Sequence, residues 1–187
     1  RKTMRVIAGT ARRLPLIAPE GKDTRPTTDR IKETLFNIIQ DDVPGAMFLD
    51  LFSGSGAIGI EALSRGAKKC VFVDNGQRQI ECIRDNLKTT RLEDRAVIAS
   101  GDVLSPIGRL AAKKEHFDLI FMDPPYNHGW EQKVLSALRP TSLADEDTLI
   151  IVEASLNTDF SWIEEAGFTI SRIKEYKTNK HVFLKIK

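Results

Sequence analysis

The chain has 187 residues, of which 41% are hydrophobic and 29% charged, the balance of a globular protein with one domain or one domain and a small appendage. Its two cysteines, Cys70 and Cys82, lack metal-binding spacing, and no apolar run reaches membrane-spanning length. Composition therefore excludes a disulfide scaffold, a cysteine-rich metal site and a membrane-spanning protein, and favours a cytoplasmic location.

The charge is distributed unevenly along the chain. The net charge is only +2, but residues 1–40 hold nine Lys/Arg against four Asp/Glu, and residues 172–187 hold six against one. The middle of the chain, residues 41–171, holds thirteen Lys/Arg against twenty-one Asp/Glu. Two basic ends around an acidic middle indicate that the ends meet a polyanion, although each end alone could be a solvated tail.

The first 45 residues predict a basic extension made of a hairpin and a helix. Residues 5–17 are typical of a small hairpin with a Gly-Thr-Ala turn, and Pro15 favours an edge position. Thr28 is a suitable N-cap for a helix whose apolar face holds Ile31, Leu35 and Ile38. We therefore expect residues 1–45 to form an extension to a main domain of residues 46–187.

Apolar runs and helical patterns alternate from residue 46 onward, which predicts a Rossmann-like, doubly wound α/β fold with a mostly parallel seven-stranded sheet. The predicted strands are 46–51, 69–74, 95–100, 117–122, 148–153, 168–176 and 181–187, and the predicted helices are 57–65, 77–90, 103–112, 130–138 and 160–166. Residues 177–180 are too short for a crossover, so we expect the last strand to be antiparallel.

A glycine-rich turn follows the first predicted strand of the main domain. Gly54-x-Gly56-x-x-Gly59 fits the dinucleotide fingerprint, in which glycines allow a sharp turn and a close approach to a ligand. The fingerprint alone does not separate NAD from other adenosine cofactors. Asp50, which precedes the turn, suits a cationic ligand better than a pyrophosphate.

Acidic residues end four successive predicted strands, namely Asp50, Asp74, Asp102 and Asp123. Ligands of such sheets bind at this carboxyl edge, where Asp74 could accept both ribose hydroxyls, Asp102 an adenine amine, and Asp50 the charge of a cationic cofactor directly or through water. A single acid there is often only a cap or turn former, and Asp102 could cap the helix that starts at Val103.

The stretch Asp123-Pro124-Pro125-Tyr126 is the sharper signal. An aromatic amine is a poor nucleophile, and two acceptors, the Asp123 side chain and the Pro124 carbonyl, could take its two hydrogens and stabilise the developing positive charge. Tyr126 offers a face on which a base can stack. The alternative is a proline turn with a packed tyrosine.

These motifs resemble those of Rossmann-like S-adenosylmethionine-dependent methyltransferases, and Asp-Pro-Pro-Tyr resembles the signature of those that methylate exocyclic amines. More narrowly, the chain resembles the RsmD family of guanine-N2 methyltransferases of 16S ribosomal RNA. The stretches that carry this resemblance are Arg5-Val6-Ile7-Ala8-Gly9, Arg25-Pro26-Thr27-Thr28-Asp29-Arg30, Leu35-Phe36-Asn37-Ile38, Asp50 to Ala67, Phe72-Val73-Asp74 and Asp123 to Tyr126.

The resemblance implies that the cofactor is S-adenosylmethionine, leaving as S-adenosylhomocysteine, with no metal, and that a monomer acts on 16S ribosomal RNA in an assembling small subunit. It implies cofactor contacts from Asp50, Phe52, Ser53, Gly54, Gly56, Asp74, Asp102 and Val103, catalytic roles for Asp123, Pro124 and Tyr126, and RNA contacts from Arg5, Arg12, Arg13 and Arg25. The chain departs from the family pattern where Arg12 and Arg13 are adjacent, and where Lys177 follows Tyr176 in place of a glycine.

Other functions stay open at this stage. A DNA adenine-N6 methyltransferase shares Asp-Pro-Pro-Tyr, but this chain has little room for a target-recognition domain. A protein amide methyltransferase would leave the basic ends unexplained. An NAD-dependent oxidoreductase would explain the glycines and Asp74 but would give Asp123 and Tyr126 no role, and a silent RNA-binding module would not need all four acids.

Overall fold

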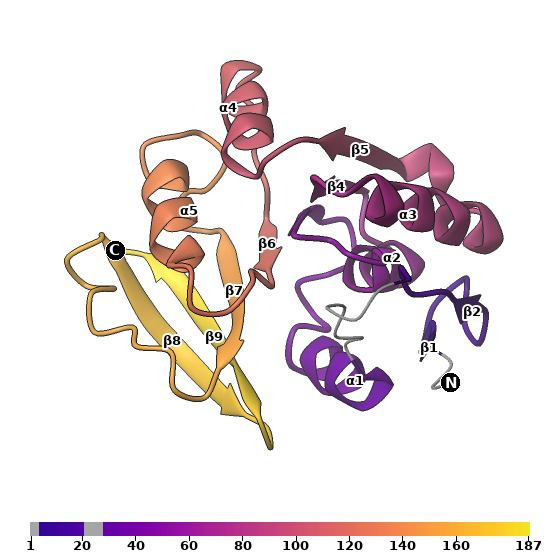
Figure 1. The fold of residues 1–187 in the computed structure, drawn as a ribbon, viewed down its shortest axis with the longest axis horizontal. Helices are drawn as coiled ribbons and strands as arrows, with labels where there is room; N and C mark the ends of the chain where they lie inside the picture. The colour runs from indigo at the N-terminus through magenta and orange to yellow at the C-terminus, as the bar shows by residue number, and fades with distance from the viewer. Residues whose placement is uncertain (1–3, 21–27) are drawn as a thin grey trace.

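A seven-stranded sheet forms the middle of the molecule, and a two-stranded hairpin lies beside it (Figure 1). The structure is a computed structural model that describes residues 4–20 and 28–187. The strand order is β5-β4-β3-β6-β7-β9-β8, with β3 to β7 parallel and β9 antiparallel to both of its neighbours, as the sequence predicts. In the described ranges no helix is long and apolar enough to cross a bilayer.

The elements follow the predicted alternation closely. The strands are β1 (Met4–Arg5), β2 (Pro15–Leu16), β3 (Met47–Leu51), β4 (Lys69–Asp74), β5 (Ala96–Ser100), β6 (Leu119–Met122), β7 (Leu149–Ser155), β8 (Phe168–Glu175) and β9 (Asn179–Ile186). The helices are α1 (Asp29–Ile38), α2 (Ala57–Ser64), α3 (Gln77–Thr90), α4 (Leu104–Ala112) and α5 (Trp130–Leu138), with a 3-10 turn at Glu93–Arg95. Thr28 caps α1, as expected, because its Oγ1 accepts a hydrogen bond from the Ile31 amide.

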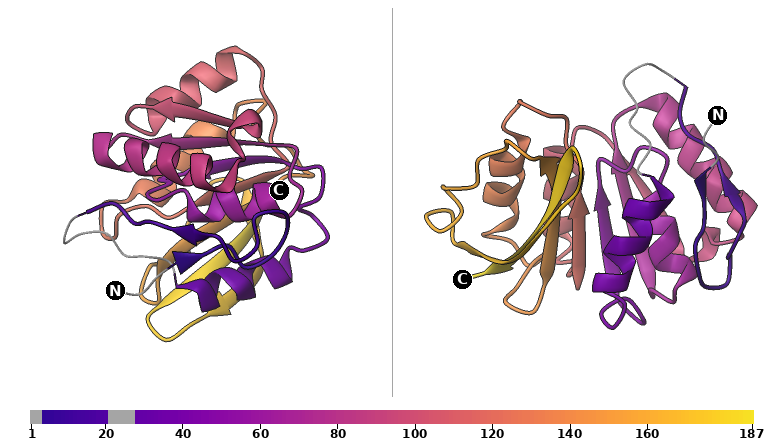
Figure 2. Two further views of the ribbon diagram at one scale, coloured as in Figure 1. Left: turned by 90° about the vertical axis from the view of Figure 1, so that its right-hand side faces the viewer. Right: turned by 90° about the horizontal axis from the view of Figure 1, so that it is seen from below.

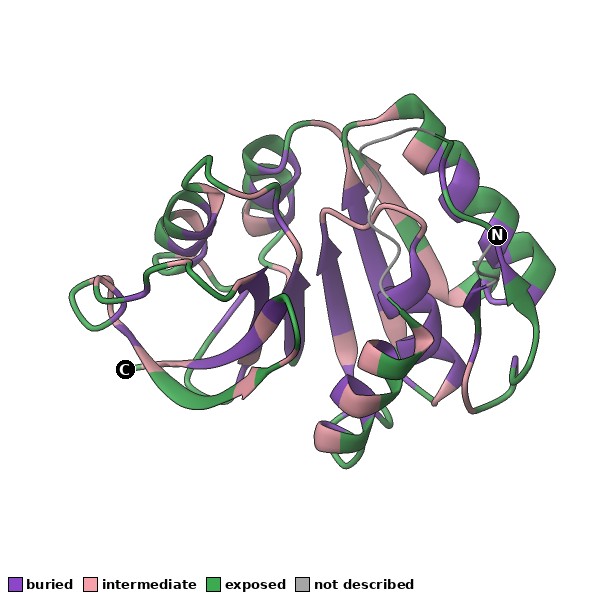
Figure 3. Ribbon diagram, turned by 60° about the horizontal axis from the view of Figure 1, so that its bottom comes forward, coloured by how far each residue is buried: buried purple, intermediate pink, exposed green. Residues whose placement is uncertain are grey.

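The four parallel strands β3, β4, β6 and β7 are buried on both faces because successive side chains alternate between two apolar clusters, whereas the edge strand β5 is partly exposed (Figures 2 and 3). One cluster contains Phe48, Phe72 and Phe121 and is covered by α1, α2 and α3. The other contains Leu49 and Val71 and is covered by α4 and α5. Because helices cover both faces of the central strands, the sheet leaves its carboxyl edge open, and polar side chains can gather there.

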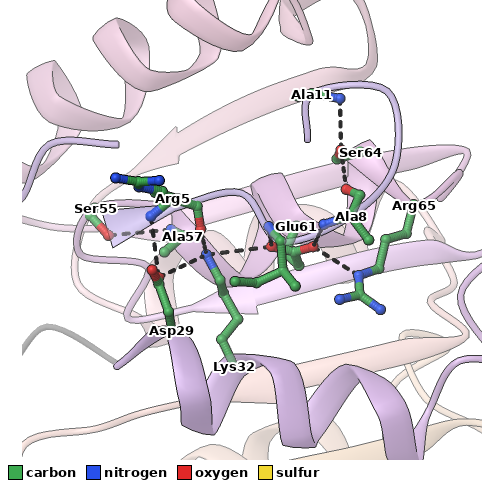
Figure 4. A network of polar contacts seen from close by, with 12 residues as sticks. Arg5, Ala8, Ala11, Asp29, Lys32, Ser55, Ala57, Glu61, Ser64 and Arg65 are labelled. Atoms are coloured by element: carbon green, nitrogen blue, oxygen red, sulfur yellow. Dashed lines mark hydrogen bonds and ion pairs between the residues drawn. The ribbon is translucent and has the colours of Figure 1, made fainter. Parts of the chain in front are cut away.

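The N-terminal arm, residues 4–20, is hydrogen-bonded to two buried residues of α2, Glu61 and Ser64 (Figure 4). Glu61 is fully buried, and its two oxygens accept hydrogen bonds from the Ile7 amide (2.8 Å) and the Ala8 amide (3.1 Å). The Arg65 Nε also donates to Glu61, at 2.8 Å. The arm is therefore held by its backbone amides as well as by its buried apolar side chains, while Arg5, Arg12 and Arg13 stay exposed.

A buried lysine completes this network. Lys32 of α1 is 1% exposed, and its Nζ donates to the Arg5 carbonyl at 2.6 Å and lies 3.4 Å from Glu61 Oε1. Burial lowers the pKa of Lys32, while the Glu61 carboxylate opposes that shift. Lys32 and Glu61 thus join the arm, α1 and α2 in one polar contact inside an apolar cluster.

Two local predictions are wrong. Residues 160–166 form successive turns and no helix, because Ile163 and Gly167 donate to the carbonyls three residues earlier, at Phe160 and Glu164, and the Trp162 indole donates to the Asp159 carbonyl. The last strand begins at Asn179 and not at residue 181, since the Tyr176 amide donates to the Asn179 carbonyl and tightens the hairpin.

Candidate active site

The turn after β3 has the backbone that its glycines predict. Gly54 has φ +59° and Gly56 has φ +80°, and between β3 and these glycines Phe52 also adopts a positive φ of 58°. A non-glycine residue in this region carries strain of the kind found at ligand sites. A Cβ added to Gly54 would meet nothing within 4 Å, so the turn presents its backbone to open space.

Gly59 has a different role from the two turn glycines. A Cβ at Gly59 would lie 2.4 Å from the Phe72 ring and 2.6 Å from the Cys70 sulfur. The first turn of α2 therefore packs directly on β4, which is the third glycine's part in the fingerprint. This close packing brings the start of α2 to the carboxyl ends of β3 and β4.

Asp50 lies beneath the turn and is 1% exposed. Its Oδ2 accepts a hydrogen bond from the Gly59 amide at 3.1 Å. Burial raises the pKa of Asp50 well above its usual range against the effect of that hydrogen bond, and the Asp74 and Asp123 carboxylates raise it further. Asp50 borders a cavity of about 60 Å³ together with residues that include Ser53, Gly54 and Asp123.

Asp74 connects the end of β4 to the glycine turn. Its Oδ2 accepts from the Gly54 amide at 2.9 Å, and its Oδ1 accepts from the Gly76 amide at 3.0 Å. The next residue, Asn75, donates to Asp102 Oδ1 at 3.0 Å and so links the ends of β4 and β5. Three of the predicted acids are thereby fixed relative to the turn.

The main cavity opens at this edge and has a volume of about 500 Å³. That size lies within the usual range for a small-molecule or cofactor site. The glycine turn and the Asp-Pro-Pro-Tyr stretch form its walls together with the arm; the lining residues are Met4, Ala18, Pro19, Phe52, Gly54, Ser55, Asp74, Asn75, Gln79, Asp123, Pro124, Pro125, Tyr126 and His128. The cavity therefore joins two motifs that lie some seventy residues apart in the sequence.

A smaller cavity of about 110 Å³ lies next to the main one and shares Phe52, Asp74 and Asn75 with it. Asp102 and Val103 border this cavity, as does Trp130 at the start of α5. The Phe52 and Trp130 rings lie 6.1 Å apart between centroids at an interplanar angle of 60°. A slot with two aromatic rings and a carboxylate can hold a planar base that carries an amine.

The Asp123–Tyr126 stretch follows β6 directly. The register of β3 and β6 pairs Leu51 with Met122, the last residue of each strand, and the residues that follow, Phe52 and Asp123, both border the main cavity. Pro124 is buried, whereas Tyr126 is half-buried and borders the main cavity. The stretch therefore places a carboxylate and an aromatic ring on the cavity that the glycine turn borders.

The described members of the predicted RNA-binding set, Arg5, Arg12 and Arg13, are not among the residues that line this cavity. Arg5, Arg12 and Arg13 are exposed on the arm, and Arg13 adopts φ 72° in the hairpin turn. Arg25 lies outside the described residues. The three described arginines share the arm with Met4 and Pro19, which do border the cavity.

Sequence reasoning missed several residues of the cavity walls. Met4, Ala18 and Pro19 come from an extension that we expected to lie outside the main domain, and no local signal in the sequence indicates their role. Asn75 could have been found, because it directly follows a strand-end acid, and Trp130 because it starts the helix after the Asp-Pro-Pro-Tyr stretch.

The sheet order, the glycine turn and the acids at the strand ends define the chain as a Rossmann-like methyltransferase. The family model "Conserved hypothetical protein 95" matches residues 4–185. The chain belongs to this family, the RsmD family of methyltransferases, as the resemblance predicts.

Individual relatives agree with this assignment. YlbH of Bacillus subtilis is 40% identical over 80% of this chain and 82% of its own. Ribosomal RNA small subunit methyltransferase D of Escherichia coli is 33% identical over 91% of this chain and 84% of its own. Among solved structures, yhhF from Escherichia coli is similar with a TM-score of 0.82 at 28% identity, covering 99% of this chain and 98% of the other.

Proposed function

We propose that the protein is an S-adenosylmethionine-dependent methyltransferase that modifies the exocyclic N2 amine of a guanine in 16S ribosomal RNA. The observation that carries the proposal is the single cavity bordered by Gly54, Asp74, Asp123 and Tyr126. The relatives named as ribosomal RNA small subunit methyltransferase D support the RNA substrate. The proposal includes a monomer that acts in the cytoplasm on an assembling small subunit.

The cavities fit the proposed cofactor. The open backbone at Gly54 leaves room for a ligand against the turn, and both Asp74 oxygens keep lone pairs beyond those that accept from the Gly54 and Gly76 amides. Asp74 would bind the ribose hydroxyls, Asp102 and Val103 with Phe52 would bind the adenine, and Ser53 and Gly56 would shape the turn around the rest. When bound, S-adenosylmethionine supplies an electrophilic methyl group on a cationic sulfur.

Acidic residues gather beneath the turn, where Asp50 and Asp123 border the same small cavity. The Asp74 and Asp123 carboxylates add to the effect of burial in raising the pKa of Asp50, so negative charge at this edge disfavours the ionised form of Asp50. A cation at this edge relieves that repulsion, so the acids select a positively charged cofactor over its neutral product. This preference supports S-adenosylmethionine over NAD, whose pyrophosphate would add negative charge.

Asp123, Pro124 and Tyr126 would act on the base. The Asp123 carboxylate and the Pro124 carbonyl accept hydrogen bonds from the amine, which orients its lone pair and stabilises the positive charge that appears as the bond to carbon forms. Tyr126 stacks on the base and holds it outside its RNA stack. The amine needs no prior deprotonation, because its proton becomes acidic only as the methyl group is transferred.

The arm would bind the RNA backbone. Arg5, Arg12 and Arg13 are exposed while the arm's backbone is fixed on α2, so their charges are presented from a rigid base. We include Arg25 in this proposal from the sequence alone. Contacts of this kind go mainly to phosphates and weaken as salt rises.

Incubation with labelled S-adenosylmethionine and 16S ribosomal RNA, free and in small-subunit particles, tests the proposal. Nucleoside analysis should find N2-methylguanosine as the labelled product. Labelled N6-methyladenosine on DNA would instead support the adenine methyltransferase, and calorimetric binding of NAD without S-adenosylmethionine would support the oxidoreductase. Substitution of Arg12 and Arg13 by Glu should weaken RNA binding while the affinity for the cofactor stays unchanged.

A further inference from the structure

A second polar cluster lies at the carboxyl edge of the sheet and has no part in the function proposed above. Glu153 of β7 and His181 of β9 are direct cross-strand partners, with 2.6 Å between Glu153 Oε1 and His181 Nε2. The other ring nitrogen, Nδ1, lies 2.9 Å from the Tyr176 hydroxyl. His181 is fully buried and Glu153 is 6% exposed, so three side chains form one hydrogen-bonded row inside the protein.

The protonation states in this row follow from its surroundings. Burial lowers the pKa of His181 to about 4 against the opposing effect of Asp123, so the imidazole is neutral at pH 7. Burial and the Glu153 charge raise the pKa of Tyr176 to about 12, so its hydroxyl keeps the proton. The assignment that satisfies every group has Tyr176 donating to Nδ1 and Nε2–H donating to Glu153. The row therefore holds Glu153 as an oriented acceptor.

Glu153 lies beside Asp123. The register of β6 and β7 pairs Met122 with Val152 on neighbouring strands, which lie about 4.8 Å apart; Asp123 is the first residue after β6, and Glu153 follows Val152 in β7. Phe121 and Ile151 belong to the cluster under α1 to α3; Glu153, two residues after Ile151 in β7, points to that same face, and Asp123 borders one cavity together with Phe121. The influence of Asp123 on the pKa of His181 agrees with this proximity.

A target guanine would thus meet two carboxylates in a row. Its Watson–Crick edge presents adjacent donors, the N1–H and the N2 amine, and enzymes that extrude a base read this edge by hydrogen bonds. Adenine presents an unprotonated N1 beside its amine, which would face the Glu153 carboxylate as acceptor against acceptor. Two neighbouring acceptors therefore match guanine and exclude adenine.

We propose that Glu153, oriented by His181 and Tyr176, accepts the N1–H of the target base and makes the site specific for guanine. This inference rests on the proposed methylation of a guanine N2 amine and adds the residue that selects the base. His181 and Tyr176 are positioning residues, since they act only through Glu153.

The analogue 2,6-diaminopurine separates recognition of N1 from reaction at N2, because it keeps the N2 amine but has no hydrogen on N1. The experiment first maps the methylated nucleotide in 16S ribosomal RNA. It then compares single-turnover methylation of two RNAs, ligated with a synthetic segment that carries either guanosine or 2,6-diaminopurine riboside at that position. The wild-type protein should favour guanosine by at least about tenfold.

Glu153→Gln reverses the preference in a way that a structural role would not. The His181 Nε2–H holds the amide oxygen, which turns the amide NH₂ toward the base as a donor to an unprotonated N1. We expect guanosine methylation to fall and that of 2,6-diaminopurine riboside to rise, changing their ratio by about 10- to 100-fold. Adding Tyr176→Phe removes the donor to Nδ1, lets the imidazole exchange tautomers, and should cancel the gain.

The results of these experiments separate failure of the Glu153 inference from failure of the proposed function. If the wild-type protein methylates no guanine N2 amine, both proposals fall. If it methylates guanosine and 2,6-diaminopurine riboside at equal rates, only the inference about Glu153 falls, whether or not any variant folds. An equal loss on both RNAs in Glu153→Gln, with cofactor affinity and melting temperature unchanged, likewise assigns Glu153 a structural role and overturns the inference.

Discussion

Replacing Glu61 by Ala should destabilise the protein strongly. The variant removes the acceptor for the Ile7 and Ala8 amides and for Arg65. It also removes the nearer of the two carboxylates beside the buried Lys32, whose other carboxylate, Asp29, lies 3.8 Å away. Removing one member of a buried ion pair costs about 3–5 kcal/mol. Each orphaned buried amide would add about 1–3 kcal/mol, but the arm can detach and hydrate these groups. We therefore expect a loss of about 3–5 kcal/mol.

Urea unfolding at pH 7, followed by circular dichroism, measures this loss as a change in the free energy of unfolding. A typical domain has only about 5–15 kcal/mol in total, so the midpoint should fall steeply. Glu61→Gln keeps an acceptor without the charge and should be intermediate. The matched control is Glu33→Ala, because Glu33 is exposed on the neighbouring helix α1, and its effect should stay within about 0.5 kcal/mol.

The result has a functional consequence as well. Met4 and Pro19 of the arm border the main cavity, so a detached arm should also weaken cofactor binding. A loss below about 1 kcal/mol for Glu61→Ala, similar to that of Glu33→Ala, would refute the reasoning that Glu61 holds the arm on α2.

Three further predictions concern the site and its surroundings. Asp74→Ala should weaken S-adenosylmethionine binding by about 1–3 kcal/mol in calorimetry, and unchanged affinity would remove Asp74 from the site. The single-turnover methylation rate should decrease from wild type through Asp123→Asn to Asp123→Ala, with the last variant slower by roughly 10²–10³. Tyr126→Phe should reduce the rate only mildly and Tyr126→Ala severely, because stacking survives in the first variant. Equal losses in the two Tyr126 variants would contradict the stacking role. Because burial lowers the pKa of His181 to about 4, the unfolded chain binds more protons below pH 6.5, and stability should fall by about 2 kcal/mol from pH 7 to pH 5 through this group. His181→Gln should lose that part of the pH dependence, and the same slope in both proteins would show that His181 does not cause it.

Much of the fold could be predicted because its signals are local. The apolar runs of β3, β4 and β6, the glycine turn at residues 54–59 and the Thr28 cap each depend on a few neighbouring residues. Residues 160–166 show the limit of such signals. The spacing of their apolar residues resembles that of a helix, but the segment folds as a series of turns. Side chains such as Trp162 hydrogen-bond to the local backbone and pack against the sheet.

In the candidate site, too, the positions of the acids could be predicted from the sequence but their surroundings could not. Asp50, Asp74 and Asp123 could be placed at one edge from sequence, since the carboxyl ends of parallel strands share an edge. Their environments could not, because burial depends on what packs around them. Asp50 is enclosed beneath the turn with a raised pKa, whereas Asp102 stays exposed at the end of β5.

The sequence alone determined the order of strands and helices, the glycine turn and the strand-end acids, and with them the family. Only the tertiary structure decided that the arm borders the cavity, that Glu61 and Lys32 hold it, and that Glu153, His181 and Tyr176 form a row beside Asp123. The reason is physical: these contacts join residues far apart in the sequence, such as Ile7 and Glu61, which are 54 positions apart, and they exist only once strand register and helix packing are set.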